Sequence, residues 1–275
     1  MADNYLEKKF EEHLNAPYKP AKAKHVPLKE RRAVVTGGAK GVGAAIVRSL
    51  RVAGHKVAFC DVDEVAGRET ALRTGSEFSL VDVTDVEAFR AFIRSIEAKW
   101  GGVDIIVNNV SANSLAPLLS ISPELFDKAV DTGVRPIIIG AQEMVRLRQP
   151  VAEASAVRPY GRIVNICSVR HVQSAGGDCV SSAVDGAIFS VSHTLAVELA
   201  PYGITVNSIS PGVIVTSDYE NVSPEVHAQF PSGRAGRVED VVRIVRFLIE
   251  DSSDFINAEN IVADGGLMRK MAYNL

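Results

Sequence analysis

The sequence predicts an α/β fold built on a doubly wound parallel sheet. In the segment 33–46 (AVVTGGAKGVGAAI), an apolar run of strand length passes through a glycine-rich turn into a pattern of helical spacing. Strand-like and helix-like segments then alternate along the chain, which implies right-handed crossovers and helices on both faces of the sheet. The 275 residues, 47% hydrophobic and 23% charged, suit one domain with one sizeable core.

The expected elements follow from short apolar runs that end in polar or glycine residues, separated by longer stretches of helical periodicity. Strands are expected at 33–36, 56–60, 77–81, 104–107, 161–167, 204–209 and 260–263. Helices are expected at 41–53, 64–73, 85–99, 123–146, 179–200 and 238–249. In a sheet of this kind ligands bind beyond the carboxyl ends of the strands, so the turns after the strands are the candidate site.

The glycine-rich turn after the first strand is the first candidate binding element. Gly37, Gly38, Gly41 and Gly43 allow a diphosphate to approach the backbone, where amide N–H groups and the helix dipole neutralise it. Glycine clusters also mark ordinary turns. Asp61, however, lies 20 positions after Gly41, where an acid reaches a ribose in a dinucleotide-binding fold. The alternative for Asp61 is a helix N-cap or a solvated charge.

Charge and cysteine content exclude several classes of protein. The formal net charge of −3 and the pI of about 6.1 give no electrostatic case for nucleic acid or an anionic membrane as a partner. Cys60, Cys167 and Cys179 are scattered, which favours free thiols in a reducing compartment, and none has zinc-ligand spacing, so no metal is expected. We find no signal peptide and no apolar run long enough to span a bilayer, and we expect a cytoplasmic protein.

Residues 1–30 differ from the remainder and are expected to form an N-terminal arm before a domain at 31–275. Tyr5, Leu6, Phe10 and Leu14 recur at about helical spacing, which predicts a short amphipathic helix. Prolines and lysines that follow predict an extended linker. We expect the arm to pack on its own or a neighbouring subunit.

Several motifs in order show a specific resemblance. Thr36–Gly43 fits TGxxxGxG, Asp82 and Val83 fit an adenine-contacting pair, and Asn108 begins a partial NNAG. Further motifs are GRIVNICS at 161–168, LAVELAPYGITVN at 195–207, SPG at 210–212 and ADGG at 263–266. Over residues 31–271 the chain thus resembles the short-chain dehydrogenase/reductase family, whose fold is a single Rossmann-type domain.

The resemblance implies a dinucleotide site along the carboxyl edge of the sheet. The diphosphate would lie on Thr36, Gly37, Lys40, Gly41, Val42 and Gly43. Asp61 would bind the adenosine ribose, Asp82 and Val83 the adenine, and Asn108 the neighbouring ribose. The nicotinamide end would meet Pro211, Gly212, Val213 and Thr216. Asp61 favours NAD over NADP because a carboxylate repels a 2′-phosphate, although Lys40 and Arg68 would weaken that preference.

The positions that carry proton transfer in this family depart from its pattern. The family has a tyrosine thirteen positions after the motif serine, a lysine four further on and an asparagine in the preceding helix. Ser168 is the motif serine, but those positions hold Ser181, Asp185 and Gly133. A serine hydroxyl is a weaker acid than a phenol, and a carboxylate raises the pKa of a neighbouring acid rather than lowering it. Asp185 would still accept hydrogen bonds from the nicotinamide ribose.

Two functions follow. The first is an NAD(H)-binding protein with a weak or absent oxidoreductase activity, serving as a regulatory or structural subunit. The second is an active NAD-dependent dehydrogenase or reductase of a small carbonyl or alcohol, in which Ser168 works with His171 as a substitute acid; the alternative for His171 is a solvent-facing loop residue. The resemblance also implies a homodimer or homotetramer formed through the segments 123–146 and 179–200. The segment 216–238 is expected to be a mobile lid over the substrate.

Overall fold

The computed structural model describes residues 29–112, 114–146, 148–149 and 159–271. Its centre is a seven-stranded parallel sheet in the order β3-β2-β1-β4-β5-β6-β9. The strands are β1 (Arg32–Thr36), β2 (Lys56–Asp61), β3 (Glu77–Leu80), β4 (Ile105–Asn108), β5 (Gly161–Ile166), β6 (Ile204–Pro211) and β9 (Asn260–Ala263). The strand order reverses between β1 and β4, so the sheet is doubly wound and the predicted fold class is confirmed.

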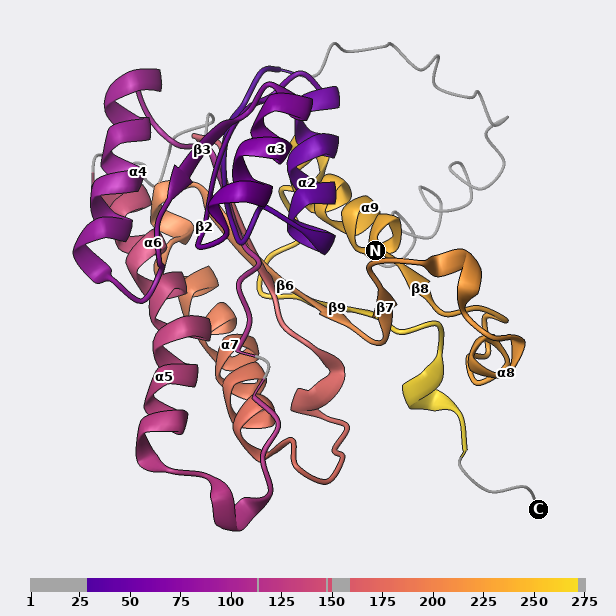
Figure 1. Ribbon diagram of the computed structural model, residues 1–275. Helices are drawn as coiled ribbons and strands as arrows, with labels where there is room; N and C mark the ends of the chain where they lie inside the picture. The colour runs from indigo at the N-terminus through magenta and orange to yellow at the C-terminus, as the bar shows by residue number, and fades with distance from the viewer. Residues whose placement is uncertain (1–28, 113, 147, 150–158, 272–275) are drawn as a thin grey trace, which may run out of the picture.

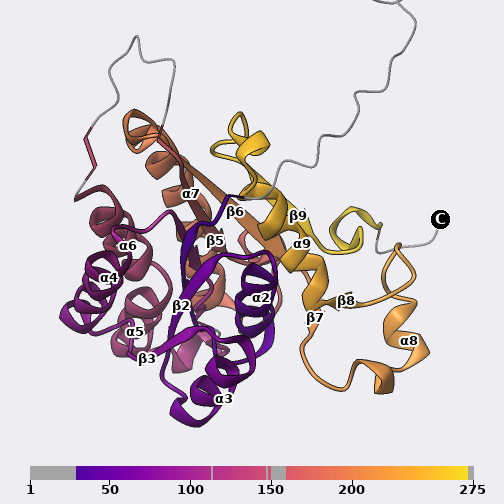
Figure 2. The ribbon, with the colours of Figure 1, turned by 90° about the horizontal axis from the view of Figure 1, so that it is seen from above.

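Helices cover both faces of the sheet (Figures 1 and 2). One face carries α4 (Val86–Trp100), α5 (Pro123–Gly133), α6 (Arg135–Arg146) and α7 (Cys179–Glu198); the other carries α2 (Gly41–Val52), α3 (Glu64–Thr74) and α9 (Val238–Leu248). Successive strand residues therefore enter two different cores: Val34 packs with the first group and Val35 with the second. This explains why the strands read as continuous apolar runs rather than as alternating patterns.

The segment predicted as one helix over 123–146 is two helices, and that prediction is wrong at its centre. α5 ends at Gly133 and α6 begins at Arg135. Pro136 stands in the first turn of α6; it has no N–H to donate to Thr132, and its ring conflicts with that residue's carbonyl in a continuous helix. The expected arm, apart from residues 29 and 30, lies outside the described residues.

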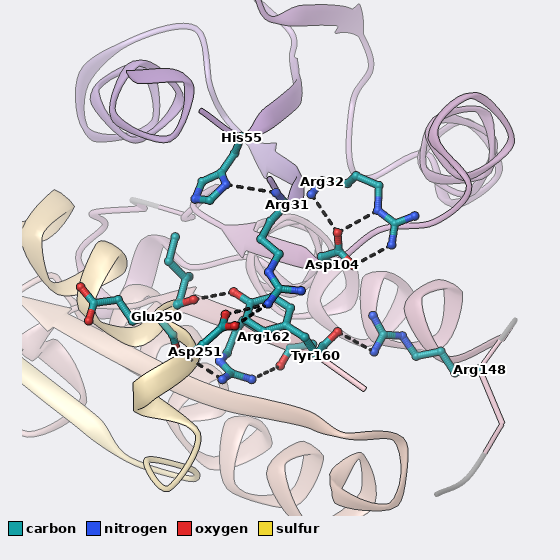
Figure 3. Close-up of polar contacts among 11 residues, drawn as sticks. Arg31, Arg32, His55, Asp104, Arg148, Tyr160, Arg162, Glu250 and Asp251 are labelled. Atoms are coloured by element: carbon teal, nitrogen blue, oxygen red, sulfur yellow. Dashed lines mark hydrogen bonds and ion pairs between the residues drawn. The ribbon is translucent and has the colours of Figure 1, made fainter. Parts of the chain in front are cut away.

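The edge of the sheet where the strands begin is closed by a cluster of arginines around a tyrosine (Figure 3). The guanidinium groups of Arg31 and Arg162 lie 3.6 Å and 4.4 Å from the centre of the Tyr160 ring. The Tyr160 hydroxyl donates to the Ile249 carbonyl over 2.5 Å, and Arg31 binds Asp251 over 2.7 Å. These contacts hold Tyr160 at the amino end of β5, at the opposite edge from the glycine-rich turn.

Helix α7 corrects the expectation that no apolar run in the chain is long enough to span a bilayer. By length and composition its 20 residues would cross a bilayer, with a mean hydropathy of 1.2. It packs, however, against α5 and β6, with Ser181, Asp185 and Ser192 buried among the other elements. A single apolar helix of this kind is weak evidence for a membrane span, and the burial of these polar side chains identifies it as a core helix.

Candidate functional site

The glycine-rich turn between β1 and α2 has the backbone that its sequence requires. Gly37 and Gly41 have φ angles of +65° and +54°, in the left-handed region that favours glycine. A Cβ atom at Gly43 would lie 1.9 Å from the Gly37 carbonyl oxygen, so no larger residue fits there. The two ends of the turn therefore pack tightly against each other, and a ligand has to approach the turn from its solvent side.

Neighbouring strands hold this turn in place. The Thr36 hydroxyl accepts the backbone N–H of Asn109 over 3.0 Å, and the Asn109 amide donates to the carbonyls of Thr36 and Gly37 over 3.2 Å and 3.0 Å. The turn after β4 thus clamps the turn after β1 at the point where the strand order reverses. Asn109 therefore stabilises the glycine-rich turn, a structural role that the partial motif did not indicate.

The amino end of α2 suits a diphosphate. No side chain caps the helix at Lys40 and its first turn holds no acidic residue, so the N–H groups there are left to a ligand. A cavity of about 900 Å³ opens beside it, between α2, α3 and the segment after β6, with Gly41 and Thr216 among its lining residues. A Cβ built on Gly41 would lie 3.4 Å from the Thr216 methyl group. Lys40, Gly41 and Thr216 are the predicted cofactor residues that line this cavity.

Asp61 stands at the end of β2 and supports the same turn. Its carboxylate accepts the backbone N–H groups of Ala39 and Asp63 over 2.9 Å and 3.0 Å. Asp63, not Asp61, is the N-cap of α3, and it forms an ion pair of 2.5 Å with Lys40. The helix-cap alternative for Asp61 is therefore wrong. Because Lys40 is paired with Asp63, its charge beside the ribose position is partly compensated.

The predicted adenine and ribose contacts differ in accessibility. Asp82 is exposed and accepts hydrogen bonds from the N–H and hydroxyl of Thr84, while Val83 is buried. The Asn108 side chain is 4% exposed and donates to Asn165 over 2.8 Å. The Oδ1 atom of the same side chain is enclosed without a hydrogen-bond partner among the described residues.

The segment after β6 forms the other wall of the site. Gly212 approaches β9 closely: its N–H donates to the Ala263 carbonyl over 3.0 Å, and a Cβ atom there would lie 2.9 Å from the Asp264 side chain. Val213 follows and is half exposed. The chain then forms a small lobe of β7 (Ile214–Val215), α8 (Pro224–His227) and β8 (Gly236–Arg237) before α9 (Figure 1). The expected lid thus has short helical turns and a two-stranded sheet.

Ser168 and His171 lie together after β5. The Ser168 hydroxyl accepts the N–H of Arg170 over 3.3 Å and so caps a single helical turn at Val169–His171. The His171 Nδ1 atom lies 2.6 Å from the Ser168 carbonyl oxygen, and its ring stacks on Phe189 of α7 at 4.7 Å. Nδ1 therefore donates to the backbone, and His171 is not bonded to the Ser168 hydroxyl.

Ser181 is buried, with 1% of its surface exposed, and it ties α7 to the loop after β4. Its hydroxyl accepts the N–H of Ser114 over 3.1 Å and donates to the carbonyl of the same residue over 3.1 Å. Next to this loop the N–H of Ala116 donates to the Gly177 carbonyl over 3.0 Å. Ser181, which occupies the family's tyrosine position, therefore connects α7 to the loop after β4.

Asp185, one turn further along α7, is 2% exposed, and its Oδ1 atom is enclosed without a hydrogen-bond partner in the described residues. Burial raises the pKa of this carboxyl to about 6, against smaller opposing effects of Arg170 and His171. Buried polar groups are usually hydrogen-bonded, so an enclosed carboxyl of this kind disfavours its own charged form.

Gly133 packs directly against α7. A Cβ atom there would lie 2.5 Å from Cγ1 of Val184, so the space that a larger residue would need is filled by valine. This pairing was not predictable from the sequence, because the two residues are far apart in the chain and both are ordinary in helices.

Replacing Gly133 with alanine is expected to destabilise the fold by about 1–3 kcal/mol, because the added methyl group overpacks the contact with Val184. Gly186 on α7 is the matched control, since nothing lies within 4 Å of its Cβ position. Gly186→Ala is expected to stabilise by up to about 1 kcal/mol through helix propensity. Urea unfolding of both variants measures the difference, and equal effects would contradict the packing argument.

Comparisons with known proteins agree with this architecture. The family model described as Enoyl-(Acyl carrier protein) reductase matches residues 37–268. A Thermotoga maritima protein described as an uncharacterized oxidoreductase is 35% identical over 260 residues, covering 90% of this chain and 99% of that protein. The 3-oxoacyl-(acyl-carrier-protein) reductase of Escherichia coli is 30% identical over 241 residues, covering 86% and 96%. The solved structure of an apo SCOR enzyme from Clostridium thermocellum aligns with a TM-score of 0.78 at 30% identity, covering 90% and 96%.

The doubly wound sheet and the open glycine-rich turn at its point of reversal define a protein of the Rossmann-type, nicotinamide dinucleotide-binding class. Within that class, the chain belongs to the short-chain dehydrogenase/reductase family. The resemblance inferred from the motifs is thus confirmed.

Proposed function

We propose that this chain binds NAD(H) and has lost the family's tyrosine-dependent hydride exchange with small carbonyls and alcohols, acting as a cofactor-dependent regulatory or structural subunit. One contrast carries the proposal. The glycine-rich turn keeps an uncapped helix end beside an open cavity, whereas Ser181 is buried and bonded to the loop at Ser114. NAD is preferred to NADP because the Asp61 carboxylate repels a 2′-phosphate.

When bound, the dinucleotide would supply a hydride donor or acceptor at its nicotinamide. The chain's own residues do the rest: the turn at Gly41 and the N–H groups of α2 neutralise the diphosphate, and Asp61 orients the ribose. Asp185 accepts hydrogen bonds from the second ribose. None of these residues delivers a proton to a carbonyl oxygen.

A titration of the purified protein with NADH and with NADPH, followed by nicotinamide fluorescence, tests the cofactor proposal. We expect micromolar binding of NADH, and binding of NADPH weaker by about tenfold or more, since one close charge repulsion of about 1.4 kcal/mol gives that factor. Asp61→Asn should reduce the difference in affinity between NADH and NADPH. Absence of binding by both would contradict the proposal.

The second candidate is an active dehydrogenase or reductase. Its relatives are named as reductases, and the stacked ring of His171 is fixed beside Ser168 with Nε2 unbonded among the described residues. A screen of NADH oxidation with small ketones and acyl thioesters separates the two functions. Robust turnover that His171→Ala abolishes would establish the second function and overturn the first.

Assembly and location belong to the same proposal. We propose pairing through α5, α6 and α7 into a homodimer or homotetramer, since family members usually pair through these helices. The scattered free cysteines favour a reducing, cytoplasmic location. Gel filtration that returned a monomer would contradict the pairing.

A further inference from the structure

A second cavity, of about 490 Å³, lies on the face of the sheet that carries α4, α6 and α7 (Figures 1 and 2). It shares no lining residue with the cavity at Gly41. The apolar side chains that line it are those of Ile138, Ala141, Val145, Leu195 and Leu199. We call it the α6 groove. An apolar groove between helices is the kind of surface that accepts the apolar face of a further helix.

One wall of the α6 groove is basic. Arg90, Arg94 and Arg146 surround the carboxylate of Glu143, with N–O distances of 2.5, 2.8 and 3.0 Å. Arg146 also binds Glu97 over 2.5 Å, so three guanidinium groups face two carboxylates. The Glu143 side chain is 1% exposed, whereas those of Arg94 and Arg146 are 48% and 40% exposed. The charge that this wall presents to solvent is therefore positive.

The opposite wall belongs to α7 and is acidic. Glu198, at the end of α7, lines the groove and is exposed. Within the part of the chain that the structure describes, no ion pair involves Glu198. A helix that fits this groove should therefore carry acidic side chains on one flank of its apolar stripe and basic side chains on the other.

The sequence of residues 4–14, at the start of the N-terminal arm, has this pattern. In a helix, Leu6, Phe10 and Leu14 follow one another at intervals of four and form one apolar stripe. At about 100° per residue, Glu7 and Glu11 lie along one flank of the stripe, and Lys9 and His13 lie along the other. Reversing the helix would exchange the two flanks, so the charges also select the direction in which it lies.

The arm is long enough to reach the α6 groove of its own chain. The described chain begins at Lys29, just before β1, and Leu199 of the groove lies shortly before β6 at the same edge of the sheet. β4 and β5 separate β1 from β6, a distance of about 15 Å across the sheet, and the helix layer adds about 10 Å. The segment 15–28 spans up to about 45 Å when extended.

We propose that residues 4–14 dock in the α6 groove of the same chain as an amphipathic helix. The apolar stripe packs on the apolar lining, and the flank with Glu7 faces Arg94 and Arg146. The groove uses no residue of α5 and only the end of α7, so α5 and the remainder of α7 stay available for the pairing proposed above. The inference does not depend on cofactor binding.

Hydrogen–deuterium exchange of the full chain tests the docking. We expect the amides of residues 8–14 to exchange at least about tenfold more slowly than those of a synthetic peptide of residues 1–16. Glu7→Lys together with Glu11→Lys should remove this protection, because attraction to the arginines becomes repulsion. Glu12→Lys is the matched control: it makes the same change of charge on the opposite face of the helix and should leave the protection unchanged. Exchange at the rate of the peptide in the natural chain would overturn the proposal.

A second pair of variants tests the groove itself. Ile138→Asp places a charge in the apolar lining and should reduce the protection of residues 8–14 about tenfold. Val197→Asp is its control, because Val197 is 74% exposed on α7 and does not line the groove. Equal effects of these two variants would overturn docking in the groove.

Two further measurements complete the test. Protection that disappears on dilution would place the arm on a second copy and overturn docking within one chain. The affinity for NADH should be the same in all these variants, because the two cavities share no residue. A failure of this inference is thus distinguishable from a failure of the proposed function.

Discussion

Four substitutions together are expected to give this chain NADH-dependent ketone reductase activity: Ser181→Tyr, Asp185→Lys, Gly133→Asn and Val184→Ala. They restore the family's phenol, the ammonium that lowers its pKa and the helix asparagine. A positioned general acid contributes about 10²- to 10⁴-fold to the rate, so we expect a gain of at least about 10²-fold over the natural chain. NADH oxidation with small ketones and acyl thioesters measures it.

The fourth substitution comes from the structure. Without it, an asparagine at position 133 would meet Cγ1 of Val184, and the variant with only three changes should be less stable and less active. Ser181→Tyr also removes the bonds to Ser114, so the loop after β4 must open to admit the ring. If the variant with all four substitutions folds and binds NADH but stays inactive on ketones, the natural chain has lost more of the catalytic machinery than these side chains.

The fold was predictable from sequence because its signals are local and repeated. Most strands contain an apolar run, and glycine or polar residues follow them at the carboxyl edge. The break between α5 and α6 was missed because apolar periodicity continues across Pro136 and obscured its effect. In this case, the constraint on the backbone outweighed the hydrophobic pattern.

The sequence carries clearer signals for the glycine-rich turn than for the contacts around Ser181 and Asp185. The glycines of the turn after β1 were identified because backbone geometry fixes which residues fit there: Gly37 and Gly41 have positive φ angles, and a Cβ atom at Gly43 would meet the Gly37 carbonyl. The burial of Ser181, the filling of the Gly133 site by Val184 and the open acceptor atom of Asp185 depend on contacts between segments distant in the chain. No spacing in the sequence reports such contacts.

Replacing Asp185 with asparagine is expected to stabilise the protein at about pH 8 by up to about 3 kcal/mol. The carboxyl pKa rises from 3.8 in the unfolded chain to about 6 in the folded one, and each unit corresponds to about 1.4 kcal/mol. A raised carboxyl pKa favours the folded state below pH 3.8, and this contribution is lost as the pH rises through 6. Asparagine avoids that loss, so the advantage of the variant should grow from about pH 4 to about pH 7 and then level off.

Urea unfolding across this pH range, with the exposed Asp127→Asn as control, tests the expectation. An advantage that did not depend on pH would mean that the carboxyl already has a partner in the folded protein.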